Sequence, residues 1–152
     1  MNPAPTTTVT RRFSAPAERL YDAWLDSQWL SRWMFGPAVR DERIVRLGLE
    51  PRVGGKFSFV VDRQGIAIDH VGTYLELDRP HLLVFTWARR DSLPETSRVI
   101  VEIVPCGDGC ELTLTHVMDA GRAAFTEQAA GSWRKRLAVL DTAVTSPLQP
   151  VS

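Results

Sequence analysis

The fold follows most directly from residues 119–145, which read DAGRAAFTEQAAGSWRKRLAVLDTAVT and contain no proline. Apolar side chains recur there at steps of about four and three, at Phe125, Ala129, Trp133, Leu137, Leu140 and Val144. This spacing places them in one stripe along an α-helix. We therefore predict one long amphipathic helix of roughly 35 Å, at a rise of about 1.5 Å per residue, whose apolar stripe needs a partner surface.

The sequence before this helix has the pattern of strands joined by short turns. A strand-like run at 6–14 precedes two short helices, the first starting near Pro16 and the second capped by Ser27. Further strand-like runs lie at 44–49, 56–61, 66–77, 81–89, 97–104 and 111–116. Strands that follow each other through short turns pair antiparallel. The order predicts an α+β fold in which a curved antiparallel sheet of about six to seven strands wraps around the final helix.

Length and composition indicate one globular domain. The chain has 152 residues, of which 44% are hydrophobic, and we expect a domain at 6–145 with frayed termini at 1–5 and 146–152. Lys plus Arg equal Asp plus Glu at 18 each, which gives no electrostatic case for nucleic acid. The sequence has neither signal-peptide features nor a long apolar run. We expect a cytoplasmic protein without a membrane span.

Seven segments carry a family resemblance: FSAPAERLYDAW (13–24), WLSRWMFGP (29–37), VGGKF (53–57), HVGTYLELDRP (70–80), LVFTW (83–87), LTLTH (112–116) and GSWRKRL (131–137). They resemble the helix-grip fold of birch-pollen-allergen, START and polyketide-cyclase proteins, the SRPBCC superfamily. The sequence is most similar to its bacterial branch related to the activator of heat-shock-protein-90 ATPase. Phe35 departs from the Trp-Gly-Pro pattern usual there. The resemblance implies a scaffold shared by ligand carriers, cyclases, hydrolases and stress proteins, so it specifies the fold better than the function.

Aromatic side chains on the expected elements are the main candidates for a ligand site. The candidates for lining a cavity between sheet and helix are Trp33, Phe57, Phe59, His70, Tyr74, Phe85, Trp87, His116, Trp133 and Leu137. Small-molecule sites are largely apolar with a few polar groups, but the same aromatics also suit a solid core. His116 shares its strand face with Leu112 and Leu114 and is expected to point inward, either as a ligand contact or as a hydrogen-bonded core histidine.

The other two histidines are expected nearer to solvent. His70 is placed at the mouth of the cavity or on a solvated strand face, and His81 is expected to be exposed. Asp69 and Glu102 interrupt apolar strands, and period-two alternation places both on the outer face.

No motif for catalysis or phosphate binding stands out. The sequence has no Gly-x-Ser-x-Gly elbow, and Gly54-Gly55 reads as a turn because Lys56 opens a strand. Cys106 and Cys110 could face each other across a hairpin, but they lack the further ligands of a zinc site. We therefore expect free thiols and assign no catalytic residue, metal or cofactor.

The final helix also carries a run of charge. Arg122, Arg134, Lys135 and Arg136 are expected to form a solvated face, with contact to a partner or to an anionic ligand head group as the alternative. Gly131 lies in mid-helix, where a close approach to the sheet or a slight bend would compensate its cost of roughly 1 kcal/mol relative to alanine.

Three functions remain open from the sequence. The first is a binding domain for a small apolar or aromatic ligand, which we favour. The second is a chaperone-activating interaction domain, although the chaperone-stimulating relatives carry an additional domain for which this chain offers no room. The third is a cyclase- or hydrolase-like enzyme. A monomer or homodimer is expected.

Overall fold

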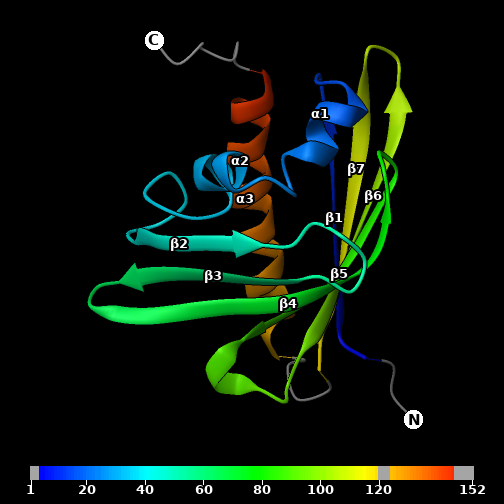
Figure 1. Cartoon of the computed structure of the whole chain (residues 1–152). Coiled ribbons are helices and arrows are strands. Elements are labelled where there is room, and N and C mark those ends of the chain that lie inside the picture. Colours follow the sequence, from blue (N-terminus) through cyan, green and yellow to red (C-terminus); the bar gives the residue numbers. More distant parts are fainter. Residues whose placement is uncertain (1–3, 120–123, 146–152) are drawn as a thin grey trace.

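The computed structural model describes residues 4–119 and 124–145 of the chain. Its elements, in chain order, are β1 (Thr6–Phe13), α1 (Ala17–Asp22), α2 (Ser27–Trp33), β2 (Arg43–Leu49), β3 (Lys56–Arg63), β4 (Ile66–Asp78), β5 (Leu82–Arg89), the short 3₁₀ helix η1 (Arg90–Ser92), β6 (Ser97–Cys106), β7 (Gly109–Val117) and α3 (Thr126–Thr145) (Figure 1). Among these residues, none of the helices has the length and apolar character that a bilayer span requires.

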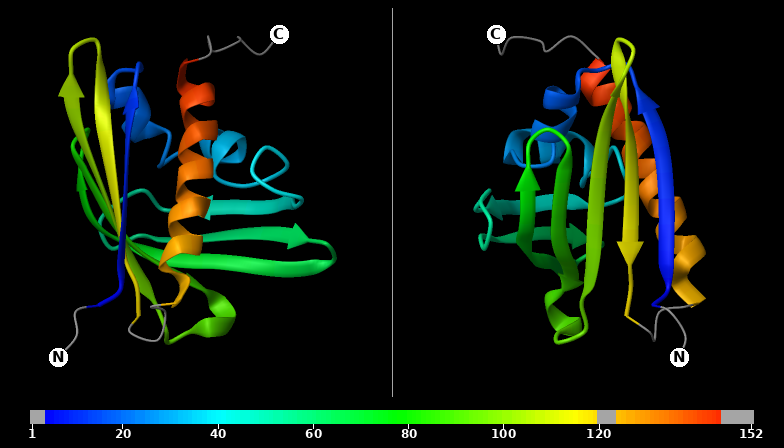
Figure 2. Two further views of the ribbon diagram at one scale, coloured as in Figure 1. Left: turned by 180° about the vertical axis from the view of Figure 1, so that it is seen from behind. Right: turned by 90° about the vertical axis from the view of Figure 1, so that its right-hand side faces the viewer.

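The strands form one antiparallel sheet of seven in the order β1-β7-β6-β5-β4-β3-β2. After β1 the chain crosses through α1 and α2 to the opposite edge and returns strand by strand. The sheet bends strongly, and α3 lies in its concave side (Figure 2). This arrangement confirms the expected helix-grip fold.

Local irregularities allow the sheet to bend. Pairing slips at Ile44/Arg46 between β2 and β3 and at Tyr74/Glu76 between β4 and β5, and such bulges bend a strand and increase its twist. A Cβ atom on Gly72 would overlap the carbonyl oxygen of Thr86 and the ring of Phe57. Glycine at this position therefore allows β4 to pass close to both of them.

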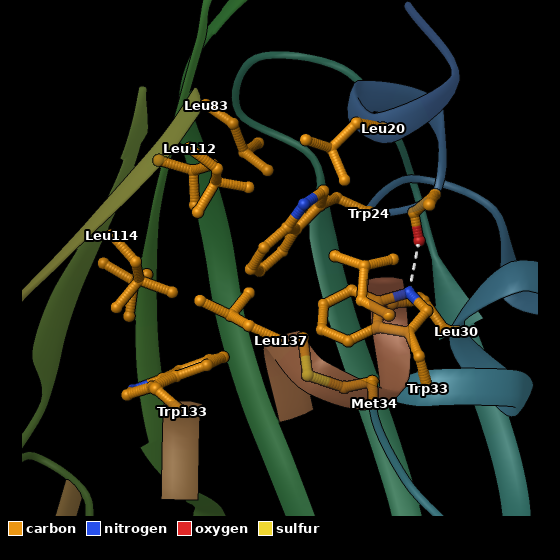
Figure 3. Packing of buried hydrophobic residues seen from close by; sticks show 14 of the residues in the cluster. Leu20, Trp24, Leu30, Trp33, Met34, Leu83, Leu112, Leu114, Trp133 and Leu137 are labelled. Atoms are coloured by element: carbon orange, nitrogen blue, oxygen red, sulfur yellow. Dashed lines mark hydrogen bonds between the residues drawn. The ribbon is translucent and has the colours of Figure 1, made fainter. Parts of the chain in front are cut away.

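The core lies between the sheet and one face of α3. That face contributes the buried residues Ala130, Trp133, Arg136, Leu137, Leu140 and Val144. Helices α1 and α2 close the same end of the core as the later turns of α3 (Figures 1 and 2). In Figure 3 the Trp24 and Trp33 rings meet edge to face with centroids 4.6 Å apart, and the Trp33 indole N–H donates to the carbonyl of Ala23 at 2.9 Å. Aromatic and aliphatic side chains together fill this end of the core.

Three details differ from the sequence expectations. Asp26, not Ser27, caps α2, because its carboxylate accepts from the backbone N–H of Gln28 at 2.8 Å. Helix α3 begins at Thr126 rather than at 119, which leaves Phe125 before the helix and 45% exposed, not on the buried stripe. The expected Arg122 lies outside the described residues.

The two cysteines do not face each other. Cys106 pairs with Gly109 and Cys110 pairs with Pro105, so the two thiols lie on opposite faces of the β6–β7 hairpin. Cys110 is buried, Cys106 is partly exposed, and both are free.

The expected close approach of Gly131 to the sheet is wrong. A Cβ atom added there would meet nothing within 4 Å, and the residue is exposed. Glycine in a helix interior costs roughly 0.5–1 kcal/mol relative to alanine.

We therefore expect Gly131→Ala to raise the free energy of unfolding by about 0.5–1 kcal/mol, because the new methyl group fits without strain. Urea denaturation of the two proteins measures this. An equal or lower stability of the variant would contradict the placement of Gly131 on an open helix face.

Candidate functional site

A cavity of about 450 Å³ lies between the first half of α3 and the inner face of the sheet. Strands β4, β5, β6 and β7 and the loop after β5 contribute to its walls. The first turns of α3 and that loop lie at the same end of the molecule, opposite α1 and α2 (Figures 1 and 2). Its volume falls in the range of sites for small molecules, about 300–1,000 Å³.

Four of the sequence candidates line this cavity: His70, Trp87, His116 and Trp133. The other six, which lie in the packed core and do not line it, are Trp33, Phe57, Phe59, Tyr74, Phe85 and Leu137. Met118, Phe125, Ala88 and Ala129 complete the apolar part of the lining. As expected, His81 and Glu102 are exposed, while Asp69 is partly buried and pairs with Arg90 at 2.8 Å.

The expectation that Arg136 belongs to a solvated charged face is wrong. Its exposed fraction is 5%, whereas Arg134 and Lys135 beside it are exposed. The burial of Arg136 could have been predicted from helical periodicity. Arg136 follows the buried Trp133 by three positions and precedes the buried Leu140 by four, so it lies on the same helix face.

Contacts from α3 and from the residues directly after α2 hold the Arg136 guanidinium. Its Nε donates to the carbonyl oxygen of Met34 at 3.0 Å, and its Nη1 donates to Ser132 Oγ at 3.0 Å. Its Cζ lies 5.6 Å from the ring centre of Phe35 and 5.2 Å from that of Trp133. Burial, with Arg40 next in effect, lowers the pKa of Arg136 to about 9, so the group is a cation at neutral pH.

A buried carboxylate, Glu42, lies behind this guanidinium. Its side chain has no exposed surface, and it pairs with Arg63 at 2.9 Å and with Arg40 at 3.8 Å. Its second oxygen accepts from the backbone N–H of Gly36 at 2.9 Å. Arg40 also donates to Ser132 Oγ at 3.2 Å, and the same oxygen accepts the hydrogen bond from Arg136. Sequence reasoning missed this network because its members come from four separate segments.

A chain of hydrogen bonds with one direction fixes His116. The Trp133 indole N–H can only donate, and it contacts His116 Nδ1 at 3.1 Å. The imidazole proton therefore lies on Nε2, which donates to Ser97 Oγ at 2.7 Å. The Ser97 hydroxyl in turn donates to the carbonyl of Trp87 at 2.7 Å.

This direction has a chemical consequence. His116 gives a proton to the Ser97 oxygen rather than accepting one, so it does not activate that hydroxyl as a nucleophile. Burial, with Arg136 adding to it, lowers the pKa of His116 to about 4. The histidine is thus a neutral part of the wall that fixes the ring of Trp133.

His70 does not lie on a solvated strand face: it is buried and forms a second neutral imidazole in the wall. Its Nδ1 lies 3.3 Å from the carbonyl oxygen of Phe59, and its ring stacks on Trp87 with centroids 5.2 Å apart. Burial, followed by Arg136, lowers the pKa of His70 to about 3. Within the described residues, no three His, Cys, Asp or Glu side chains are placed to hold a metal ion.

These pKa values predict a loss of stability in mild acid. Both histidines have folded-state pKa values below their ordinary 6.5, so the unfolded chain binds more protons between about pH 4 and 6.5. The stability they contribute is complete above this window and decreases as the pH falls through it. Each histidine should cost about 2 kcal/mol between roughly pH 7 and pH 5.

Urea denaturation at both pH values tests this in the wild type and in His116→Gln, whose amide does not titrate. The carboxylates titrate in both proteins, so the difference between the two losses isolates His116. An equal loss in both proteins would show that His116 is not held neutral.

Comparisons with known proteins agree with this fold. Protein CV1439 from Chromobacterium violaceum is 25% identical, with a TM-score of 0.79 over 93% of this chain and 98% of that one. A protein from Rhodobacter sphaeroides is 21% identical, with a TM-score of 0.81 over 98% of both chains. CalU16 from Micromonospora echinospora is 22% identical, with a TM-score of 0.70 over 93% of this chain and 77% of that one.

A search of curated proteins found no match. A sequence model of the Activator of Hsp90 ATPase homolog 1-like proteins matches residues 14–145. Membership in this group supports a ligand-binding or protein-interaction domain. The chain belongs to the Activator of Hsp90 ATPase homolog 1-like family.

Proposed function

We propose that this protein binds a small, largely apolar ligand in the cavity between α3 and the sheet. The observation that supports it best is the cavity of about 450 Å³, whose lining combines the aromatic rings of Trp87 and Trp133 with polar and charged side chains. This combination is characteristic of sites for small molecules.

The aromatic wall is ordered before any ligand arrives. Trp87 and Trp133 lie with ring centres 5.9 Å apart. His116 holds the indole N–H of Trp133, and Ser97 links His116 to the backbone of Trp87. A fixed wall lowers the entropic cost of binding. Burying about 200 Å² of apolar ligand surface would then supply about 5 kcal/mol before the costs of association.

A second candidate is a protein-interaction role, such as stimulation of a chaperone ATPase. The observation that favours it is the family match over residues 14–145. Addition of the purified protein to an Hsp90-type ATPase assay tests this role, and an unchanged rate would count against it. An enzyme that uses Ser97 as nucleophile is disfavoured, because His116 donates to that hydroxyl.

A neutral fluorescent probe, N-phenyl-1-naphthylamine, tests the binding function. We expect saturable fluorescence enhancement with one site per chain, because the probe is apolar and aromatic like the cavity wall. Ala129 lines the cavity, so Ala129→Trp should fill it and weaken probe binding at least tenfold.

Lys135→Trp is the matched control, because it adds the same ring to an exposed position of the same helix. It should leave the affinity unchanged. Equal probe binding by the Ala129→Trp variant, or absence of binding by both the probe and the organic acid tested below, would refute a ligand site in this cavity.

A further inference from the structure

The cavity wall contains more positive charge than its buried carboxylate neutralises. Three guanidinium groups, those of Arg40, Arg63 and Arg136, lie around Glu42. One Glu42 oxygen accepts from Arg63 at 2.9 Å, and the other accepts from a backbone N–H. Arg63 and Arg40 both pair with this single carboxylate, so the three guanidiniums and Glu42 together carry a net charge of +2.

Arg136 is the member that carries this excess into the cavity. It makes no ion pair with any carboxylate of the described residues, although Glu95 and Asp119 also contribute to the lining. Its Nη2 makes no hydrogen bond within residues 4–119 and 124–145. With an exposed fraction of 5%, Arg136 can offer this Nη2 donor only to solvent or to a ligand in the cavity, since the described residues supply no partner for it.

Arg40 adds a second cation on the same side. Its Nη2 and the Nη1 of Arg136 donate to the same Ser132 oxygen, at 3.2 and 3.0 Å. Two like charges that meet on one neutral hydroxyl repel each other, and an anion placed against both would remove that repulsion. Both guanidiniums line the cavity.

From this arrangement we infer that the ligand is an organic acid with an apolar body, whose carboxylate binds the guanidiniums of Arg136 and Arg40; the inference rests on the ligand-binding function proposed above. A planar carboxylate accepts two parallel bonds from a guanidinium fork. A phosphate is tetrahedral and would bring a third oxygen and a second charge, so its binding is a separate outcome of the test below. Trp87 and Met118 contact the body of the acid.

Two ligands with the same naphthalene ring test the charge requirement. They are 1-naphthaleneacetate, which has a carboxylate, and 2-(1-naphthyl)ethanol, which is neutral. Each competes with N-phenyl-1-naphthylamine for the wild-type protein. We expect the acid to bind about ten- to a hundredfold more tightly than the alcohol, the range typical of hydrogen bonds to charged groups.

Arg136→Met should remove this preference and leave the affinity for the alcohol within about threefold. Arg134→Met is the matched control, because it removes the same charge from an exposed position of the same helix, and it should keep the preference. If Arg136→Met does not fold, Arg40→Met and Arg136→Lys replace it, and each should reduce the preference at least threefold.

The outcomes separate the two proposals. Equal binding of acid and alcohol by the wild type, with the probe bound, overturns the anion site and leaves the ligand-binding function intact. Tighter binding of 1-naphthyl phosphate than of the acid overturns the assignment of a carboxylate.

If the probe does not bind, calorimetric titration of the acid into wild type and Arg136→Met decides the case. Heat that disappears in the variant supports the anion site without the probe. No binding of the acid to the wild type overturns both proposals.

Discussion

A single helix must cover the concave side of a seven-stranded sheet, and the rest of the structure follows from this constraint. Helix α3 has 20 residues, and its apolar face cannot fill the whole curved surface. Near the later turns of α3, apolar side chains from α1, α2 and the turn between them, such as Leu20, Trp24 and Trp33, fill the remaining space (Figure 3). Around the first turns, the described part of the chain leaves a cavity instead. Its position is therefore a consequence of where α1 and α2 cross the sheet.

The polar groups around this cavity are suited to binding rather than to proton transfer. His70 and His116 have pKa values of about 3 and 4, both lowered mainly by burial and further by Arg136. A general acid or base works best with a pKa near the working pH. Both histidines are neutral at physiological pH and hold neighbouring groups in place. Arg136 remains charged, so the site combines a fixed cation with two neutral imidazoles.

The sequence predicted the element order well, because strand alternation and helical spacing are local properties. It predicted that the aromatic side chains lie on elements around the space between sheet and helix, but not the position of each one along a bent sheet. Trp87 and Phe85 share a face of β5, yet only Trp87 reaches the cavity. The partners of Arg136 come from the residue that follows α2 and from α3, and those of His116 come from β6 and α3. Such contacts between distant segments have no signature in a local pattern.

The stability of the fold alone does not explain why an arginine occupies position 136. Its neighbours on the buried face of α3, Trp133 and Leu140, are apolar. Moving a charged group out of water costs several kcal/mol. The carbonyl of Met34, the hydroxyl of Ser132 and two aromatic rings offset part of that cost. A methionine or leucine there would pack without this desolvation cost. Positions where a charged residue replaces the expected apolar one tend to be functional. A bound anion supplies the missing compensation, which is why the charge of this residue, more than the shape of the cavity, indicates the class of ligand.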